Sequence, residues 1–240
     1  MNDAELQARV RELHAEGAST NHIARVLGVP RGSVAPLVRA IDREERSGTA
    51  EPAVSGCWVS AGWSSGLTVD GARDWPDRQR PGTESTSGLV AVLVARGPRR
   101  AGGDVSVSGY LVDTYCLGVK DALPPRRMSE RRLPTFVDRY FGGFDGPPLL
   151  APIELARHLV WGAVEYARGL GFEPHPDLRR AGGHLGPLTD PCAIEFGRDG
   201  KPFYIQGPHD DAARIMRTLE RTVGRDKYHF LMGADSFDVA

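Results

Sequence analysis

Four side chains with acid, base or nucleophilic chemistry lie close together near the middle of the sequence. Asp113, Cys116, Lys120 and Asp121 cluster at the end of a stretch, Val105–Val119, that alternates like one long strand. Ligands often bind where strands end, because loops there can shape a cleft. This group therefore predicts a small-molecule cleft, but it does not define a reaction.

Another group of residues has side chains that can bind transition metals. His175, Asp177, His184 and Cys192 lie in one segment rich in Gly and Pro. Their spacing, H-x-D-x6-H-x7-C, is not a standard metal-binding pattern, so we predict no metal site here.

Two further patterns resemble catalytic motifs but lack the structural context that each requires. Gly62–Gly66 has the G-x-S-x-G spacing of α/β-hydrolases with Ser64 in the nucleophile position, yet the sequence after it is strand-like and then broken by proline. Asp190 with Asp199-Gly200-Lys201 resembles the PD-(D/E)xK nucleases, but Asp199-Gly200 is typical of a hairpin tip rather than a strand. No GxGxxG, Walker or HExxH pattern is present. We therefore predict neither a catalytic residue nor a cofactor.

The arginines of the N-terminal region are separated from its acids. Residues 1–46 contain seven Arg and seven acidic residues, but the segment between Gly17 and Ile41 has three Arg and no acid. Such separation lets a locally positive surface attract phosphates although the whole chain has a net charge of −1.

The same region has the apolar spacing of three short helices. Leu6, Val10 and Leu13 predict a helix over Asp3–Glu16, and apolar residues at helical spacing predict two more within Thr20–Arg39 and just beyond it. Gly28 is suited to the turn between them. Pro36 would disrupt a helix interior, so we expect the third helix to start late, with Ser33 as its N-cap.

Thr20–Arg39 resembles the helix-turn-helix superfamily, in the homeodomain-like version found in resolvases and many bacterial regulators. The resemblance implies that the third helix enters the major groove of double-stranded DNA. We expect the arginines to contact phosphates, with Arg31 and Ser33 nearest the base edges. The predicted DNA-binding residues are Thr20, Asn21, Arg25, Arg31, Ser33 and Arg39.

The rest of the chain predicts a linker over residues 47–53 and an α+β domain over residues 54–240. We expect a mostly antiparallel sheet packed on helices. The blocks LVDTYCLGVKDA and YARGLGFEPHPDL resemble only blocks of uncharacterised bacterial proteins, which implies no chemistry.

Several elements of this domain are predicted from periodicity and turn residues. The first part is predicted to hold two short strands among Trp58, Trp63 and Trp75, a polar loop over Arg78–Ser87, and strands over Leu89–Arg96 and Val105–Val119. A Pro-rich turn then leads into a helix over Ser129–Phe141, and a main core helix that contains His158 follows over Pro152–Gly171. The last part is predicted to form a hairpin of 192–196 with 202–206, a helix from Gly207 to Val223 with Asp210 and Asp211 in its first turn, and a strand over 227–232.

Composition limits the cellular setting of the 240-residue chain. Three scattered cysteines predict reduced thiols, and neither a secretory signal nor a long apolar run is evident. We therefore expect a cytoplasmic protein without a membrane partner.

The favoured interpretation is a transcriptional regulator that binds DNA as a homodimer. The α+β domain would dimerise or sense a small-molecule or protein effector. Two alternatives stay open: an enzyme whose active site lies in the α+β domain, with the helices serving for localisation, or a protein–protein interaction module.

Overall fold

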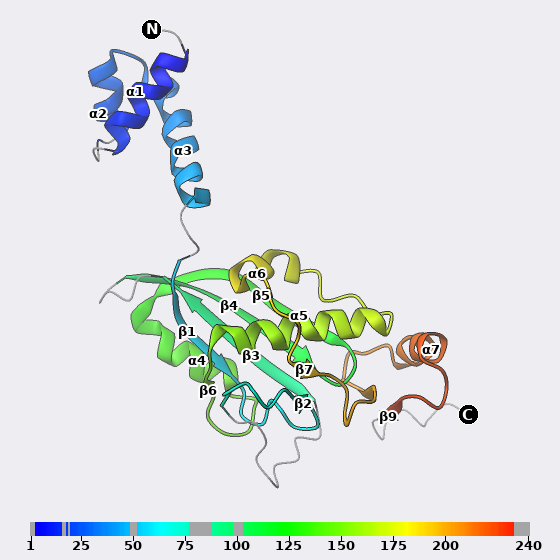
Figure 1. Ribbon diagram of the computed structural model, residues 1–240. Helices are drawn as coiled ribbons and strands as arrows, with labels where there is room; N and C mark the ends of the chain where they lie inside the picture. Colours follow the sequence, from blue (N-terminus) through cyan, green and yellow to red (C-terminus); the bar gives the residue numbers. More distant parts are fainter. Residues whose placement is uncertain are drawn as a thin grey trace. The chain divides into compact units, whose positions relative to one another are not determined.

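A computed structural model gives the structure of the chain (Figure 1). It describes residues 3–15, 18, 20–48, 52–76, 88–97 and 103–232. The chain divides into two compact units, residues 1–52 and 53–240, which are treated separately below. The predicted polar loop over Arg78–Ser87 lies outside the described residues.

The first unit consists of three helices around one apolar cluster. The helices are α1 (Asp3–Ala15), α2 (Thr20–Leu27) and α3 (Arg31–Gly48). Their buried side chains are Val10, Ile23, Ala24, Val34, Val38 and Ile41. Gly28, between α2 and α3, has a φ of +64°, a conformation that glycine adopts at little cost. The three helices predicted from the apolar periodicity are therefore confirmed.

The expected late start of α3 is wrong. The helix begins at Arg31, so Ser33 lies inside its first turn and Pro36 lies in the helix interior. Pro36 has no N–H to donate towards the carbonyl of Gly32, and its ring is exposed on the side away from the core. The buried side chains of Val34 and Val38 hold the helix in place despite this missing hydrogen bond.

The second unit is organised on a five-stranded antiparallel sheet with the order β5-β4-β3-β1-β6. The strands are β1 (Val54–Val59), β3 (Leu89–Arg96), β4 (Asp104–Asp113), β5 (Gly118–Ser129) and β6 (Leu149–Leu150). The central strand β3 is buried along almost its whole length. This confirms an α+β unit with an antiparallel sheet.

Helices cover both faces of this sheet. Helix α5 (Ile153–Gly169) and α6 (Leu178–Leu185) share one apolar cluster with Val90, Val92 and Val94 of β3. On the other face, α4 (Leu133–Phe141), which follows the 3₁₀ helix Glu130–Arg132, packs with the intervening residues of β3. Figure 1 shows α5 and α4 on opposite sides of the strands.

Helix α5 is the predicted main core helix, and His158 lies buried within it. The Nδ1 atom of His158 accepts a hydrogen bond from the N–H of Ala193 at 3.0 Å. The prediction of a core histidine bonded to backbone is thus confirmed.

The prediction of one long strand over Val105–Val119 is wrong, because the chain reverses after Asp113. The Asp113 carboxylate accepts hydrogen bonds from the N–H groups of Tyr115 and Cys116 at 2.9 and 3.0 Å. Gly118 then has a φ of +70° and lies so close to α5 that a Cβ would be 2.9 Å from the Ala163 carbonyl oxygen. The Pro-rich segment that follows is part of β5 rather than a turn, and an edge strand tolerates its prolines.

The C-terminal part also differs from the predicted hairpin. Strand β7 (Ile194–Glu195) pairs with β2 (Thr68–Val69), whereas β8 (Phe203–Ile205) pairs in parallel with β9 (His229–Leu231). Only an isolated bridge joins Arg198 to Lys201. The predicted strands therefore form, but each pairs with a segment distant in sequence.

Helix α7 (Ala212–Thr222) connects β8 to β9 and starts later than predicted. Asp211 is its N-cap and accepts a hydrogen bond from the N–H of Arg214 at 2.9 Å. Asp210 precedes the helix instead of lying in its first turn.

Replacing Pro36 by Ala should stabilise the first unit. The substitution restores an N–H donor towards Gly32 and removes a poor helix former, so we expect about 2 kcal/mol more free energy of opening for α3. Amide hydrogen exchange of the full chain measures this change. Pro30→Ala is the matched control, because Pro30 precedes the helix; equal protection of α3 in both variants would contradict the interpretation.

Candidate functional site

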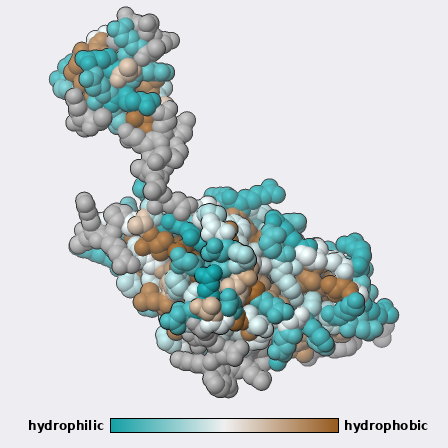
Figure 2. All heavy atoms as spheres, in the orientation of Figure 1, coloured by the Kyte–Doolittle hydropathy of each residue, from teal (hydrophilic) through white to brown (hydrophobic). Residues whose placement is uncertain are grey.

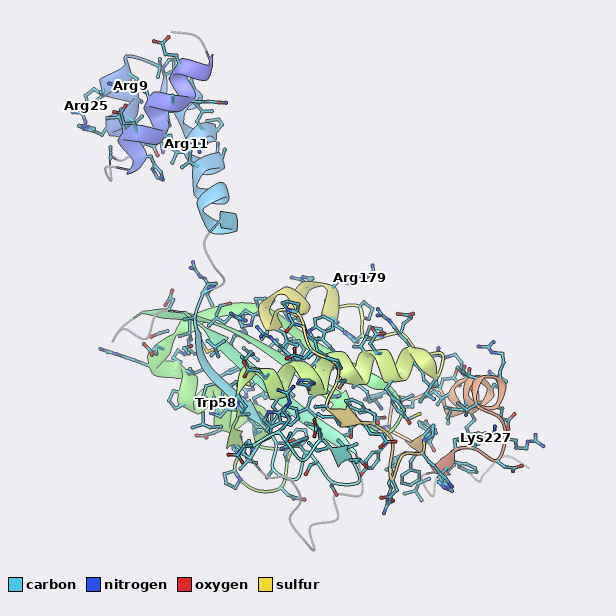
Figure 3. The ribbon with its side chains drawn as sticks, viewed as in Figure 1. Arg9, Arg11, Arg25, Trp58, Arg179 and Lys227 are labelled. Atoms are coloured by element: carbon cyan, nitrogen blue, oxygen red, sulfur yellow. The ribbon has the colours of Figure 1, made fainter. Side chains whose placement is uncertain are left out.

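The six residues predicted to contact DNA lie on one pair of helices. Asn21 and Arg25 of α2 and Arg31, Ser33 and Arg39 of α3 are exposed, and Thr20 at the start of α2 is half-buried. They face outward because the opposite, apolar face of each helix, which includes Ile23 and Val34, packs into the core. Figure 3 labels Arg25 on the outer side of α2.

Arg25, Arg31 and Arg39 have no acidic partner among the side chains that the structure describes. Arg25 and Arg31 make no ion pair with any residue whose side chain the structure describes. The Nε of Arg39 donates to the backbone carbonyl of Ala35 at 3.2 Å, which is not a charge partner. On α1, by contrast, Arg9 is paired with Glu12. The exposed surface formed by α2 and by α3 up to Ile41 is therefore suited to attract anions.

Of the four residues predicted to form a small-molecule cleft, two are buried, one is half-buried and one is exposed. Asp113 and Cys116 are 4% and 0% exposed, so neither lines an open cleft. Lys120 forms an ion pair with Asp210 at 2.9 Å. Asp121 lies on the other side of β5, exposed, with its carboxylate 3.9 Å from Nδ1 of His175.

Asp210 forms a partly buried polar cluster with Lys120, Tyr204 and Gly207. Besides Lys120, its carboxylate accepts a hydrogen bond from the N–H of Gly207 at 2.8 Å and one from the hydroxyl of Tyr204 at 3.5 Å. Sequence reasoning assigned Asp210 to a helix terminus, and no spacing pattern connects it with Lys120, ninety residues earlier. The pair joins the loop before α7 to β5.

Burial governs the protonation of Asp113 and Cys116. It raises the pKa of Asp113 to about 6, although three backbone N–H groups and nearby Lys120 favour the carboxylate. Burial, together with the charge of Asp113, also raises the pKa of the Cys116 thiol. Cys116 therefore stays protonated at neutral pH, which is unsuited to a nucleophile.

The remaining chemical candidates are not assembled into sites. Ser64 is 1% exposed and belongs to a series of turns, as the preferred interpretation of the GWSSG motif predicts. Within the described ranges, no three His, Cys, Asp or Glu side chains come together to hold a metal. Asp199 and Lys201 flank a tight turn, with Asp190 near Arg73 instead.

The four residues of the H-x-D-x6-H-x7-C pattern have separate contacts. Nε2 of His184 is 3.0 Å from the carbonyl oxygen of Ser106, and the thiol of Cys192 donates to the carbonyl of His158 at 3.6 Å. His175 and Asp177 belong to the turn that leads into α6, where the N–H of Asp177 donates to Nδ1 of His175 at 3.3 Å.

Comparison with known proteins gives no relative. No protein-family model, curated protein or solved structure matches the chain. A helix able to cross a bilayer is not found among the residues that the structure describes. Function must therefore be argued from the geometry and charge of the chain itself.

Replacing Asp113 by Asn should change the pH dependence of stability. The folded-state pKa of about 6 lies above the reference value of 3.8, so the contribution of this group to stability is complete below about pH 4 and is lost as pH rises through 6. Asn keeps the acceptor oxygen but does not ionise. We expect Asp113→Asn to gain roughly 3 kcal/mol over the wild-type chain between pH 4 and pH 7.

Denaturant unfolding at both pH values measures this gain. Asp121→Asn serves as the control, because Asp121 is exposed and lies on β5, the strand that pairs with β4. If the free energy of unfolding of Asp113→Asn differs from that of the wild type by the same amount at both pH values, the raised pKa assigned to Asp113 is contradicted.

Proposed function

We propose that the chain binds double-stranded DNA through the exposed faces of α2 and α3, and that it regulates transcription. The observation that carries this proposal is the acid-free segment between Gly17 and Ile41, whose Arg25, Arg31 and Arg39 are exposed and without acidic partners among the described side chains. A DNA duplex attracts such a surface by releasing its condensed counterions.

The connection between α2 and α3 supports a helix-turn-helix arrangement. Only Gly28, Val29 and Pro30 separate the two helices, and the N–H of Val29 donates to the carbonyl of Ala24 at 3.1 Å. Ala24 is buried, and its small side chain permits a close crossing of the helices. A helix in this position fits the width of the major groove of DNA.

We propose different roles for the exposed residues of α2 and α3. Arg31 and Ser33 lie in the first turn, where a recognition helix presents side chains to base edges. Arg39, two turns later, and Arg25 on α2 would contact the phosphates on either side. The earlier start of α3 thus places Arg31 on the helix itself rather than in the preceding turn.

A single unit of this size has few cationic contacts with DNA. Contacts from three arginines provide weak binding at physiological salt, whereas a dimer doubles the number of contacts and spans two half-sites. We therefore propose that the second unit, residues 53–240, dimerises or responds to an effector.

A triple substitution tests the proposal. Replacing Arg25, Arg31 and Arg39 by Ala should weaken binding to a mixed-sequence duplex at least about tenfold. It should also reduce the slope of log affinity against log salt by about 0.9 for each phosphate that an arginine no longer neutralises. Fluorescence anisotropy over a salt series measures both quantities.

The matched control removes the same charge from the second unit. Arg179, Arg180 and Arg217 are all exposed, and their replacement by Ala should leave the affinity and the slope near the wild-type values. If both triple variants lose affinity equally, binding depends on total charge and the assignment to α2 and α3 is wrong. Unchanged binding by the first variant would refute DNA binding through this surface.

A further inference from the structure

A cavity of about 770 Å³ lies beside α5 in the second unit. Its volume is within the range of small-molecule sites, about 300–1,000 Å³. The lining combines aromatic rings, aliphatic side chains, two carboxylates and one thiol, and includes Trp161, Glu165, Tyr166, Cys192, Glu195 and Phe196. In the view of Figure 2, hydrophobic residues interrupt the hydrophilic surface on the face that α5 crosses in Figure 1.

Fixed contacts hold the walls of this cavity in place. The indole Nε1 of Trp161 donates to the carbonyl of Gly186 at 2.8 Å. The rings of Tyr166 and Phe196 stack with centroids 5.9 Å apart. Gly162 lets the opposite wall approach, because a Cβ there would be 2.5 Å from Sγ of Cys192 and 2.6 Å from the Phe196 ring. The cavity is therefore preorganised, which reduces the entropic cost of binding.

The charged residues that line the cavity are both acidic. Glu165 is half of an ion pair with Arg168 at 3.0 Å on the same helix. Glu195 on β7 is exposed, and its carboxylate has no hydrogen-bond or ion-pair partner in the described part of the chain. Aromatic faces also attract cations, through the negative potential of their π-systems.

We propose that this cavity binds a small organic cation with an apolar body. The apolar body packs against Trp161 and Phe196, and the cationic group faces Glu195. This proposal concerns the second unit alone and does not depend on DNA binding by the first. A separate cavity of about 640 Å³, which includes Arg198 and Lys201, has basic residues in its lining and does not share this preference.

Cys192 provides a built-in reporter of the charge in the cavity. It is exposed and lines the cavity, whereas Cys57 and Cys116 are buried. Two methanethiosulfonate reagents, one with a trimethylammonium group and one with a sulfonate group, measure this charge. In both reactions the Cys192 thiolate attacks the reagent, a disulfide forms, methanesulfinate leaves and the thiol proton goes to solvent.

Labelling rates of the full chain are followed by intact-protein mass spectrometry. The ratio of the cationic to the anionic rate, divided by the same ratio for free 2-mercaptoethanol, should be at least about five. Benzyltrimethylammonium, a cation with an apolar ring, should slow labelling by either reagent, while phenylacetate at the same concentration should not. Cys192→Ser should abolish this labelling, because Cys57 and Cys116 are buried.

Two variants that each remove one negative charge distinguish the effect of Glu195 in the cavity from the effect of the overall charge of the protein. Glu195→Gln should lower the normalised ratio to about one, whereas Glu220→Gln on α7, away from the cavity, should leave it unchanged. The proposal is overturned if the anionic reagent reacts as fast as the cationic one. It is also overturned if benzyltrimethylammonium protects no better than phenylacetate, or if both Glu variants lower the ratio equally.

Discussion

The second unit depends on the burial of both faces of strand β3. Val90, Val92 and Val94 fill the core beneath α5, while Ala91, Leu93 and Ala95 fill the core beneath α4. A register shift of one residue would exchange these two sets of side chains between cores of different shape. The pairing of β3 with β1 and β4 is therefore specified by packing on both sides.

This constraint also positions the helices that cover the sheet. Tyr110 of the adjacent strand β4 donates its hydroxyl hydrogen to the carbonyl of Ala181 at 2.8 Å, and Nε of Arg96 donates to the carbonyl of His184 at 2.6 Å. These bonds attach α6 to the sheet, and α5 approaches β5 closely at Gly118. The outer face of α5, with Trp161, is consequently left to form the wall of the cavity.

The sequence predicts those elements whose burial repeats over many residues. Strand β3 is a continuous apolar run, and α5 has a broad apolar face, so each could be located from its own residues. The reversal after Asp113 could not, because it depends on a carboxylate that binds two backbone N–H groups and on the contact of Gly118 with α5. The partners of β7 and β8 lie far along the chain and leave no local signal.

Some residues of the candidate sites were predictable from the sequence, whereas others are brought together only by the fold. The exposure of Arg25, Arg31 and Arg39 follows from the amphipathic pattern of two short helices and was predictable. The contact of Lys120 with Asp210 joins segments ninety residues apart, and so required the folded structure. The lining of the cavity also comes from separate segments, α5 and the chain from Pro187 to Gly200.

Binding of DNA by a chain with a net charge of −1 requires that its positive charge be concentrated locally. The most direct test of this central claim is an NMR titration of the ¹⁵N-labelled full chain with a DNA duplex. The account predicts that amide shifts concentrate within Thr20–Arg39, while the amides of β3 and α5 stay unchanged. Shifts confined to the second unit, or no shifts at saturating DNA, would contradict it.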